Sequence, residues 1–188
     1  MEYFEEEAFK QLDSKITPLQ AGQYEHCTFV ECDISESDLR DVRFIECEFV
    51  NTNLSNCNLY KCSFQNVVFR ECKLLGLLFE RSDQLNFSLR CYDCDLSHSS
   101  FFGMKLSQCV FEDSILHGVG FEEAKLVEST LVSCDLLNAR FEKSDLSKCD
   151  FRDSKNYQIN PEMNMIKGAQ FSYPEVLALL DKYKLKIE

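Results

Sequence analysis

Large apolar residues recur at every fifth position along most of the chain. One series of twelve spans residues 24–79 and a second series of twelve spans residues 96–151. Two positions before each large residue stands Gly, Ala, Ser, Thr, Cys or Val in 22 of the 24 cases. The pattern is clearest from Ala139 to Phe151. Its large positions are Tyr24, Phe29, Ile34, Leu39, Phe44, Phe49, Leu54, Leu59, Phe64, Phe69, Leu74, Phe79, Leu96, Phe101, Leu106, Phe111, Leu116, Phe121, Leu126, Leu131, Leu136, Phe141, Leu146 and Phe151.

A period of five excludes the usual amphipathic elements. On an α-helix a step of five residues turns by about 140°, so the large side chains would spread around the cylinder. On a flat strand an odd step changes face each time. Both arrangements would leave many Leu and Phe side chains in water. The backbone must therefore turn a corner every five residues and coil around its own core, as solenoid proteins do.

Similar residues also recur at a spacing of 20, as in Phe29, Phe49 and Phe69. This predicts four five-residue units per coil and about eight parallel coils. At a strand spacing of about 4.8 Å these coils would form a rod on the order of 40 Å long. Between Phe79 and Leu96 the step is two positions longer than three whole units. We therefore expect a bulge or small loop to interrupt the rod near residues 81–90.

The N-terminal segment leaves two alternatives open. Phe4, Phe9 and Leu19 keep the phase of the first series, whereas Ser14 breaks it. Apolar residues four apart in the same segment would also suit a helix. An irregular first coil is the favoured interpretation, so that the solenoid would span residues 1–171.

The C-terminal segment, residues 172–188, is predicted to be a helix and tail. After a loop at 156–165 the repeat resumes, and Ser172 and Pro174 are typical of a helix start, with Ser172 as N-cap. An exposed apolar face on this helix predicts a homodimer. The expected dimerisation residues are Val176, Leu177, Leu180 and Tyr183.

Composition narrows the functional classes. The formal net charge of −12 argues against direct binding to nucleic acid and allows a basic protein partner. No apolar run is long enough to span a membrane, and the acidic N-terminus lacks the features of a signal peptide. We therefore expect a cytoplasmic protein.

The residues that could carry chemistry are explained by the repeat. Ten of the eleven cysteines occupy the small inward position and Cys91 occupies a large one, so we expect free thiols in the core. The three histidines fall at outward positions and share no ligand spacing. Recurring aspartates before the large residues are repeat positions that face outward. The sequence thus predicts no enzyme, no catalytic residue, no metal site and no cofactor.

Charge distribution is the remaining functional signal. Eight acidic residues lie between Glu25 and Glu48, opposed by only Arg40 and Arg43, and a second acidic group lies in the later series. We expect these acids to form the surface that binds a partner. The candidate residues are Glu31, Glu36, Asp41, Glu46, Glu48, Glu112, Asp113, Glu122, Glu123 and Glu128.

The small–polar–large pattern over about residues 22–171 resembles that of the pentapeptide-repeat family. This resemblance implies a right-handed quadrilateral parallel β-helix followed by a short C-terminal α-helix. The acidity, the two series and the apolar helix after Phe171 are similar to the quinolone-resistance (Qnr-type) branch of the family. That branch implies a dimeric, non-catalytic DNA mimic that binds DNA gyrase or topoisomerase IV, both type II topoisomerases. The alternative is a scaffold or interaction module with an unrelated protein partner.

Overall fold

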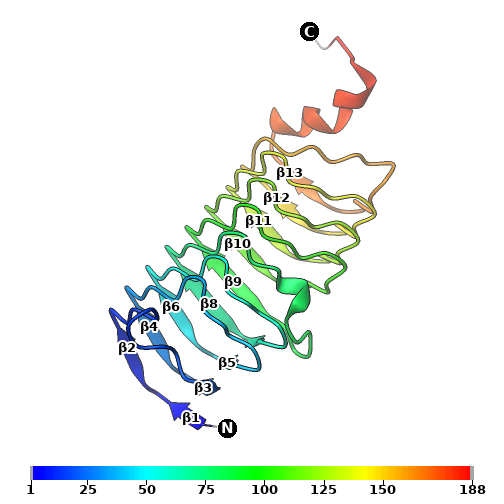
Figure 1. The fold of residues 1–188 in the computed structure, drawn as a ribbon. Coiled ribbons are helices and arrows are strands. Elements are labelled where there is room, and N and C mark those ends of the chain that lie inside the picture. Colours follow the sequence, from blue (N-terminus) through cyan, green and yellow to red (C-terminus); the bar gives the residue numbers. More distant parts are fainter. Residues whose placement is uncertain (1, 187–188) are drawn as a thin grey trace.

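The chain coils into a straight-sided rod in the computed structural model, which describes residues 2–186 (Figure 1). Within these residues the regular elements are thirteen short β-strands and two 3-10 helices. The strands are β1 (Glu2–Glu5), β2 (Ala8–Lys10), β3 (Gly22–Glu25), β4 (Thr28–Val30), β5 (Arg43–Ile45), β6 (Glu48–Val50), β7 (Ser63–Gln65), β8 (Val67–Arg70), β9 (Leu89–Tyr92), β10 (Val110–Glu112), β11 (Thr130–Val132), β12 (Asp150–Phe151) and β13 (Gln170–Phe171). The helices are η1 (Phe79–Arg81) and η2 (Glu175–Tyr183).

Every strand pair is parallel, and successive coils are paired at the predicted spacing of four units. Phe29 is opposite Phe49 and Phe49 is opposite Phe69. Strands β1, β3, β5 and β7 form one face, and a nine-stranded sheet forms the next face. The other two faces are joined by isolated bridges between coils. The fold is thus the predicted quadrilateral parallel β-helix.

The core follows the five-residue pattern. All 24 large positions are no more than 2% exposed. Their rings stack coil upon coil: Phe29 and Phe49 are 4.6 Å apart between centroids at 8°. Stacking of this kind adds about 0.5–1.5 kcal/mol per pair beyond the burial of apolar area. The apolar column along the axis is therefore continuous.

The residues at the corners of the rod have a left-handed backbone conformation, with positive φ. The residue two positions after a large apolar one has positive φ in most units, as in Glu31 (54°), Asp41 (58°) and Asn51 (48°). A left-handed residue bends the chain sharply, and its amide then bonds to the following coil, as Glu31 N does to Val50 O at 3.0 Å. This turn lets side chains five residues apart all point inward.

The register changes once along the rod. Ser63 pairs with Asp83, four whole units later, whereas Val67 pairs with Leu89, which is two positions further than four units. The two additional residues therefore lie between Asp83 and Leu89, and the exposed Leu85 projects there. The sheet of β1, β3, β5 and β7 ends at this coil.

The two ends of the rod differ. The first coil is built from β1 and β2, with Phe4 opposite Tyr24, so the helical alternative for this segment is wrong. At the other end η2 is a 3-10 helix, and it begins at Glu175 without a side-chain cap. Ser172 is not its N-cap, because its hydroxyl instead bonds to the Asp153 carboxylate at 2.9 Å. Residues 187–188 of the predicted tail lie outside the described residues. No helix in the described part of the chain is long and apolar enough to cross a membrane.

Candidate partner-binding surface

The recurring aspartates have a structural role. Each accepts a hydrogen bond from the backbone N–H of the residue two positions later, at distances of 2.9–3.3 Å. This arrangement is an Asx-turn, which stabilises the bend that follows. The residues are Asp33, Asp38, Asp95, Asp135, Asp145 and Asp150. Their carboxylates are therefore already used by the fold.

The cysteines line the core. All eleven are free and buried. Burial raises the pKa of Cys47 and of Cys57 to about 12, so both remain thiols at neutral pH. The Sγ of Cys47 lies 3.3 Å from the carbonyl oxygen of Tyr24 in the preceding coil. Among residues 2–186, no group of three or more His, Cys, Asp and Glu side chains could hold a metal ion.

The ten predicted acidic residues do not gather on one face. Glu31, Glu36, Asp41 and Glu46 are four consecutive corner residues, each with positive φ, and they surround one coil. Of the later group, Asp113, Glu123 and Glu128 are also corner residues. The acidic segment in the sequence is thus spread around the circumference of the rod.

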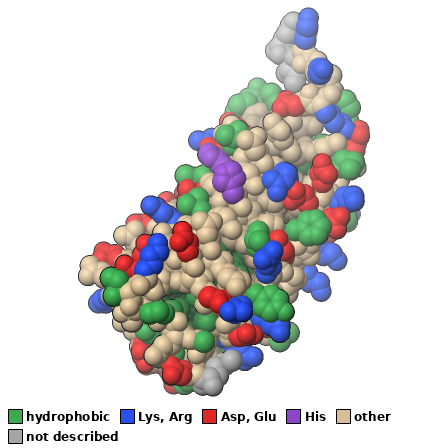
Figure 2. All heavy atoms as spheres, in the orientation of Figure 1, with side chains coloured by type: hydrophobic (Ala, Val, Ile, Leu, Met, Phe, Trp, Pro, Cys, Tyr) green, Lys and Arg blue, Asp and Glu red, His purple; other side chains and the backbone are tan. Residues whose placement is uncertain are grey.

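Ion pairs with Lys or Arg neutralise five of these ten residues, and Glu46 faces the imidazole of His26 at 3.4 Å. Arg70 and Lys148 in neighbouring coils pair with Glu48 and Glu128 at 2.9 and 2.7 Å. Lys15, Arg140 and Lys143 pair in the same way with Glu36, Glu122 and Glu123. Within the described residues, the unpaired members are Glu31, Asp41, Glu112 and Asp113. On the face in Figure 2, acidic and basic side chains are accordingly interspersed.

One corner of the rod carries a column of unpaired acids, which we call the acidic ridge. It follows the nine-stranded sheet at strands β4, β8, β9, β10 and β12, and all of its side chains are exposed and outside every ion pair among the described residues. Its members are Glu31, Glu71, Asp93, Asp113 and Asp153. The ridge crosses six coil steps, or about 29 Å at a strand spacing of about 4.8 Å.

The flanking cations do not neutralise the ridge. Arg70, Arg152 and Lys155 lie one or two positions from it in sequence, but they pair with Glu48, Asp150 and Asp135. Lys73 lies two positions from Glu71 and forms no ion pair with it within the described residues. Negative charge therefore persists along this corner.

Sequence reasoning identified Glu31 and Asp113 but missed the other three ridge residues. Counting acids within one segment cannot find a column whose members lie a whole coil or more apart. The signal is present in the sequence, because stepping by 20 from Glu31, and by 22 across the interruption, gives a column of seven corners, five of them acidic. The column reads Glu31, Asn51, Glu71, Asp93, Asp113, Ser133 and Asp153.

The predicted dimerisation residues lie on η2. Val176 and Leu177 are half-buried, whereas Leu180 and Tyr183 are 37% and 51% exposed. The inner side of η2 contributes Ala178 and Leu179 to the core. The hydroxyl of Tyr183 donates a hydrogen bond to the Glu162 carboxylate at 2.6 Å, which connects η2 to the loop at 156–165. An apolar strip of η2 is therefore left on the surface.

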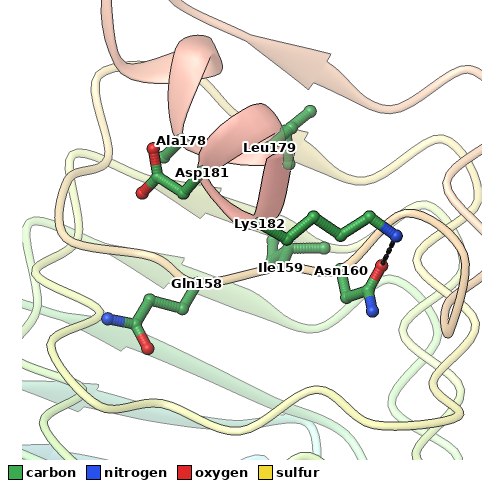
Figure 3. A pocket seen from close by; sticks show the side chains of 7 residues that line it. All are labelled: Gln158, Ile159, Asn160, Ala178, Leu179, Asp181 and Lys182. Atoms are coloured by element: carbon green, nitrogen blue, oxygen red, sulfur yellow. Dashed lines mark hydrogen bonds between the residues drawn. The ribbon is translucent and has the colours of Figure 1, made fainter. Parts of the chain in front are cut away.

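A hollow of about 240 Å³ lies between η2 and the last loop (Figure 3). Lys182 crosses it and donates to the Asn160 side chain at 3.0 Å, and it also pairs with Glu162. Asp181 and Lys182 point in different directions in Figure 3. The lining residues, Gln158, Ile159, Asn160, Ala178, Leu179, Asp181 and Lys182, include no nucleophile paired with a general base.

Family models identify the repeat. The model for the pentapeptide repeat region matches residues 18–90, and the model for pentapeptide repeats (8 copies) matches residues 94–131 and 115–153. The chain belongs to the pentapeptide-repeat family. No curated protein matches it.

Solved structures show the same fold. A trypsin-treated variant of QnrB1, a plasmid-mediated fluoroquinolone resistance protein, is 16% identical with a TM-score of 0.50, covering 100% of this chain and 92% of that chain. Full-length QnrB1 is 18% identical with a TM-score of 0.46, covering 98% and 100%. HetL, a pentapeptide repeat protein involved in heterocyst differentiation regulation from the cyanobacterium Nostoc sp. strain PCC 7120, is 16% identical with a TM-score of 0.44, covering 89% and 84%. At these identities the likeness concerns the fold alone.

Proposed function

We propose that the protein is a non-catalytic DNA mimic that binds a type II topoisomerase, DNA gyrase or topoisomerase IV, and modulates it or protects it from quinolones. The acidic ridge is the observation that carries this proposal. Five unpaired carboxylates follow one straight corner of a rod for about 29 Å, at multiples of the coil spacing of about 4.8 Å. A DNA strand presents phosphates about every 3.4 Å along a duplex. A surface that binds phosphates through Lys and Arg would also attract this ridge.

The backbone does not require these acids. Left-handed corners favour Gly, Asn and Asp, and elsewhere they hold Lys61, Gln108 and Lys143. Glu31 and Glu71 occupy such corners without an ion pair within residues 2–186, so their charge contributes little to the stability of the rod. Glu31 accepts a hydrogen bond from Gln11 and Asp153 accepts one from Ser172, but neither bond removes the negative charge that a basic partner would meet.

The resemblance to the Qnr-type branch is consistent with this proposal. QnrB1, which shares this fold, is a fluoroquinolone resistance protein. In this chain η2 follows the last coil, where the resemblance to the Qnr-type branch implies a dimerisation helix. The apolar strip of η2, with Val176, Leu177, Leu180 and Tyr183, would join two copies into a dimer. A dimer would present two ridges to one enzyme.

Supercoiling by purified gyrase, with and without the protein and a quinolone, tests the proposal. The ridge variant Glu71→Lys/Asp93→Lys/Asp113→Lys should raise the protein concentration needed for inhibition or protection by roughly tenfold, equivalent to about 1.4 kcal/mol. The matched control, Glu36→Lys/Glu123→Lys/Glu128→Lys, changes net charge equally at corner acids paired with lysines and should have a smaller effect. Wild-type protein that neither inhibits nor protects at micromolar concentration would refute the proposal and favour an unrelated partner.

A further inference from the structure

The N-terminal end of the rod is an open sheet edge. In later coils, the residue before a large apolar one donates its backbone N–H to the preceding coil, as Ser63 does to Val42 O and Thr28 does to Glu7 O, both at 2.9 Å. Tyr3 occupies in β1 the position of Ser63, and no coil precedes β1 within the described residues. Its N–H therefore lies on a free edge, which is a template for a further strand.

This edge is both acidic and apolar. The exposed acids beside β1 form no ion pair within the described residues: Glu2, Glu5, Glu6 and Glu7. Among the described residues no further coil covers the apolar side chains of the first coil, and these are only partly buried: Phe4, Phe9, Leu12 and Leu19. The end thus offers free backbone groups, apolar contact area and negative charge.

The opposite end of the chain carries the complementary features. The tail after η2 leaves the rod at the end far from β1 (Figure 1). After η2, whose C-cap is the left-handed Lys184, the residues Lys184-Leu185-Lys186 alternate basic and apolar side chains. In an extended conformation this alternation is that of a strand with one charged side. Lys184 and Lys186 are exposed and form no ion pair among residues 2–186, and Leu185 is 57% exposed.

We propose that the tail at Lys184–Lys186 of one copy adds as a strand to the free edge of β1 in a second copy. Main-chain hydrogen bonds to Tyr3 would hold the strand, and its lysines would face the acids beside β1. Leu185 would cover the apolar end of the first coil. A symmetric contact between two N-terminal ends is disfavoured, since it would oppose like charges.

The proposed contact buries little surface area, and it does not close into a symmetric dimer. A strand of a few residues buries less area than a permanent interface, so the association is transient. Because tail and edge are different surfaces, each added copy leaves one of each free, and the assembly grows with concentration. The contact uses residues beyond η2 and depends neither on the topoisomerase role nor on dimerisation through the helix.

Charge exchange between the two ends tests the proposal in the full-length chain. Sedimentation velocity over about 10 μM to about 1 mM, where small interfaces become populated, should show the wild-type average mass rising. Glu5→Lys/Glu6→Lys and Lys184→Glu/Lys186→Glu should each abolish the rise. Their equimolar mixture should restore it, because each variant then offers the charge that the other lacks. Asp41→Lys/Lys61→Glu, exposed and in the middle of the rod, should associate like wild type.

A backbone variant separates strand addition from charge attraction. Tyr3→Pro removes the free-edge N–H and should abolish the association, whereas Tyr3→Phe should preserve it. Unchanged melting temperatures would show that the variants are folded. A constant wild-type mass, a mixture that fails to restore association, or a Tyr3→Pro chain that associates like wild type would each overturn the proposal.

Discussion

Replacing Phe101 by Ala provides a strict test of the five-residue register. Phe101 is fully buried and lies between two parallel rings, Phe79 at 4.6 Å and Phe121 at 5.4 Å, both within 4° of parallel. Phe111 contacts its edge at 5.7 Å. A buried Phe→Ala change costs about 3–5 kcal/mol. Two stacked partners place the expected loss near the upper end, at about 4–5 kcal/mol.

The adjacent residue supplies the control. Phe102 has the same side chain but is 50% exposed, so Phe102→Ala should cost less than about 1 kcal/mol. Urea unfolding followed by circular dichroism measures both changes. With a slope of about 2 kcal/mol per molar, Phe101→Ala should lower the midpoint by about 2 M. Equal losses for the two variants, or a loss below about 2 kcal/mol at Phe101, would show that the register is wrong.

Three further predictions follow from the ends, the thiols and the turn carboxylates. Deleting residues 174–188 should yield monomers in light scattering at low concentration, and a persisting dimer would exclude η2 as the interface. A thiol reagent at neutral pH should label none of the eleven cysteines in the native protein and all of them in denaturant, because all eleven are buried in the core; rapid native labelling would contradict the packed core. Hydrogen bonds from Arg152 lower the pKa of Asp150 in the folded protein. The ionised carboxylate therefore stabilises the fold above the unfolded pKa of about 3.9, and this stabilisation is lost as the pH falls through the folded pKa. Asp150→Asn should therefore melt below wild type at pH 7 by a gap that closes in acid; a gap independent of pH would refute this account.

The buried positions of the structure could be predicted from the sequence, because the core repeats every five residues. The five-residue spacing alone identifies Leu106 and Phe111 as core residues. The two additional residues between Phe79 and Leu96 locate the change of register. The loop at 156–165 could not be predicted in the same way, because it does not repeat. Tyr157 and Ile159, which stand in a segment predicted as a loop, are buried and close the core beneath η2.

The surface proposed to bind a partner was predictable in its charge but not in its location. Whether Glu128 is neutralised depends on Lys148 in the next coil, and whether Glu122 is neutralised depends on Arg140, also one coil further along the chain. Such pairs exist only once the coils are stacked. The choice between four corners therefore required the register, and the register placed the unpaired acids on the corner that includes Glu71 and Asp93.

The left-handed corners have a consequence for how such proteins change. Two inward positions in each unit maintain the core, and the backbone at the corner is formed by residues as different as Glu31, Lys61 and Asn51. Corner side chains can therefore be exchanged column by column without disturbing the packing beneath them. Exposed corner positions and core positions are separate within the same five-residue unit, so substitutions along one corner would change the surface of the rod while its core stays the same.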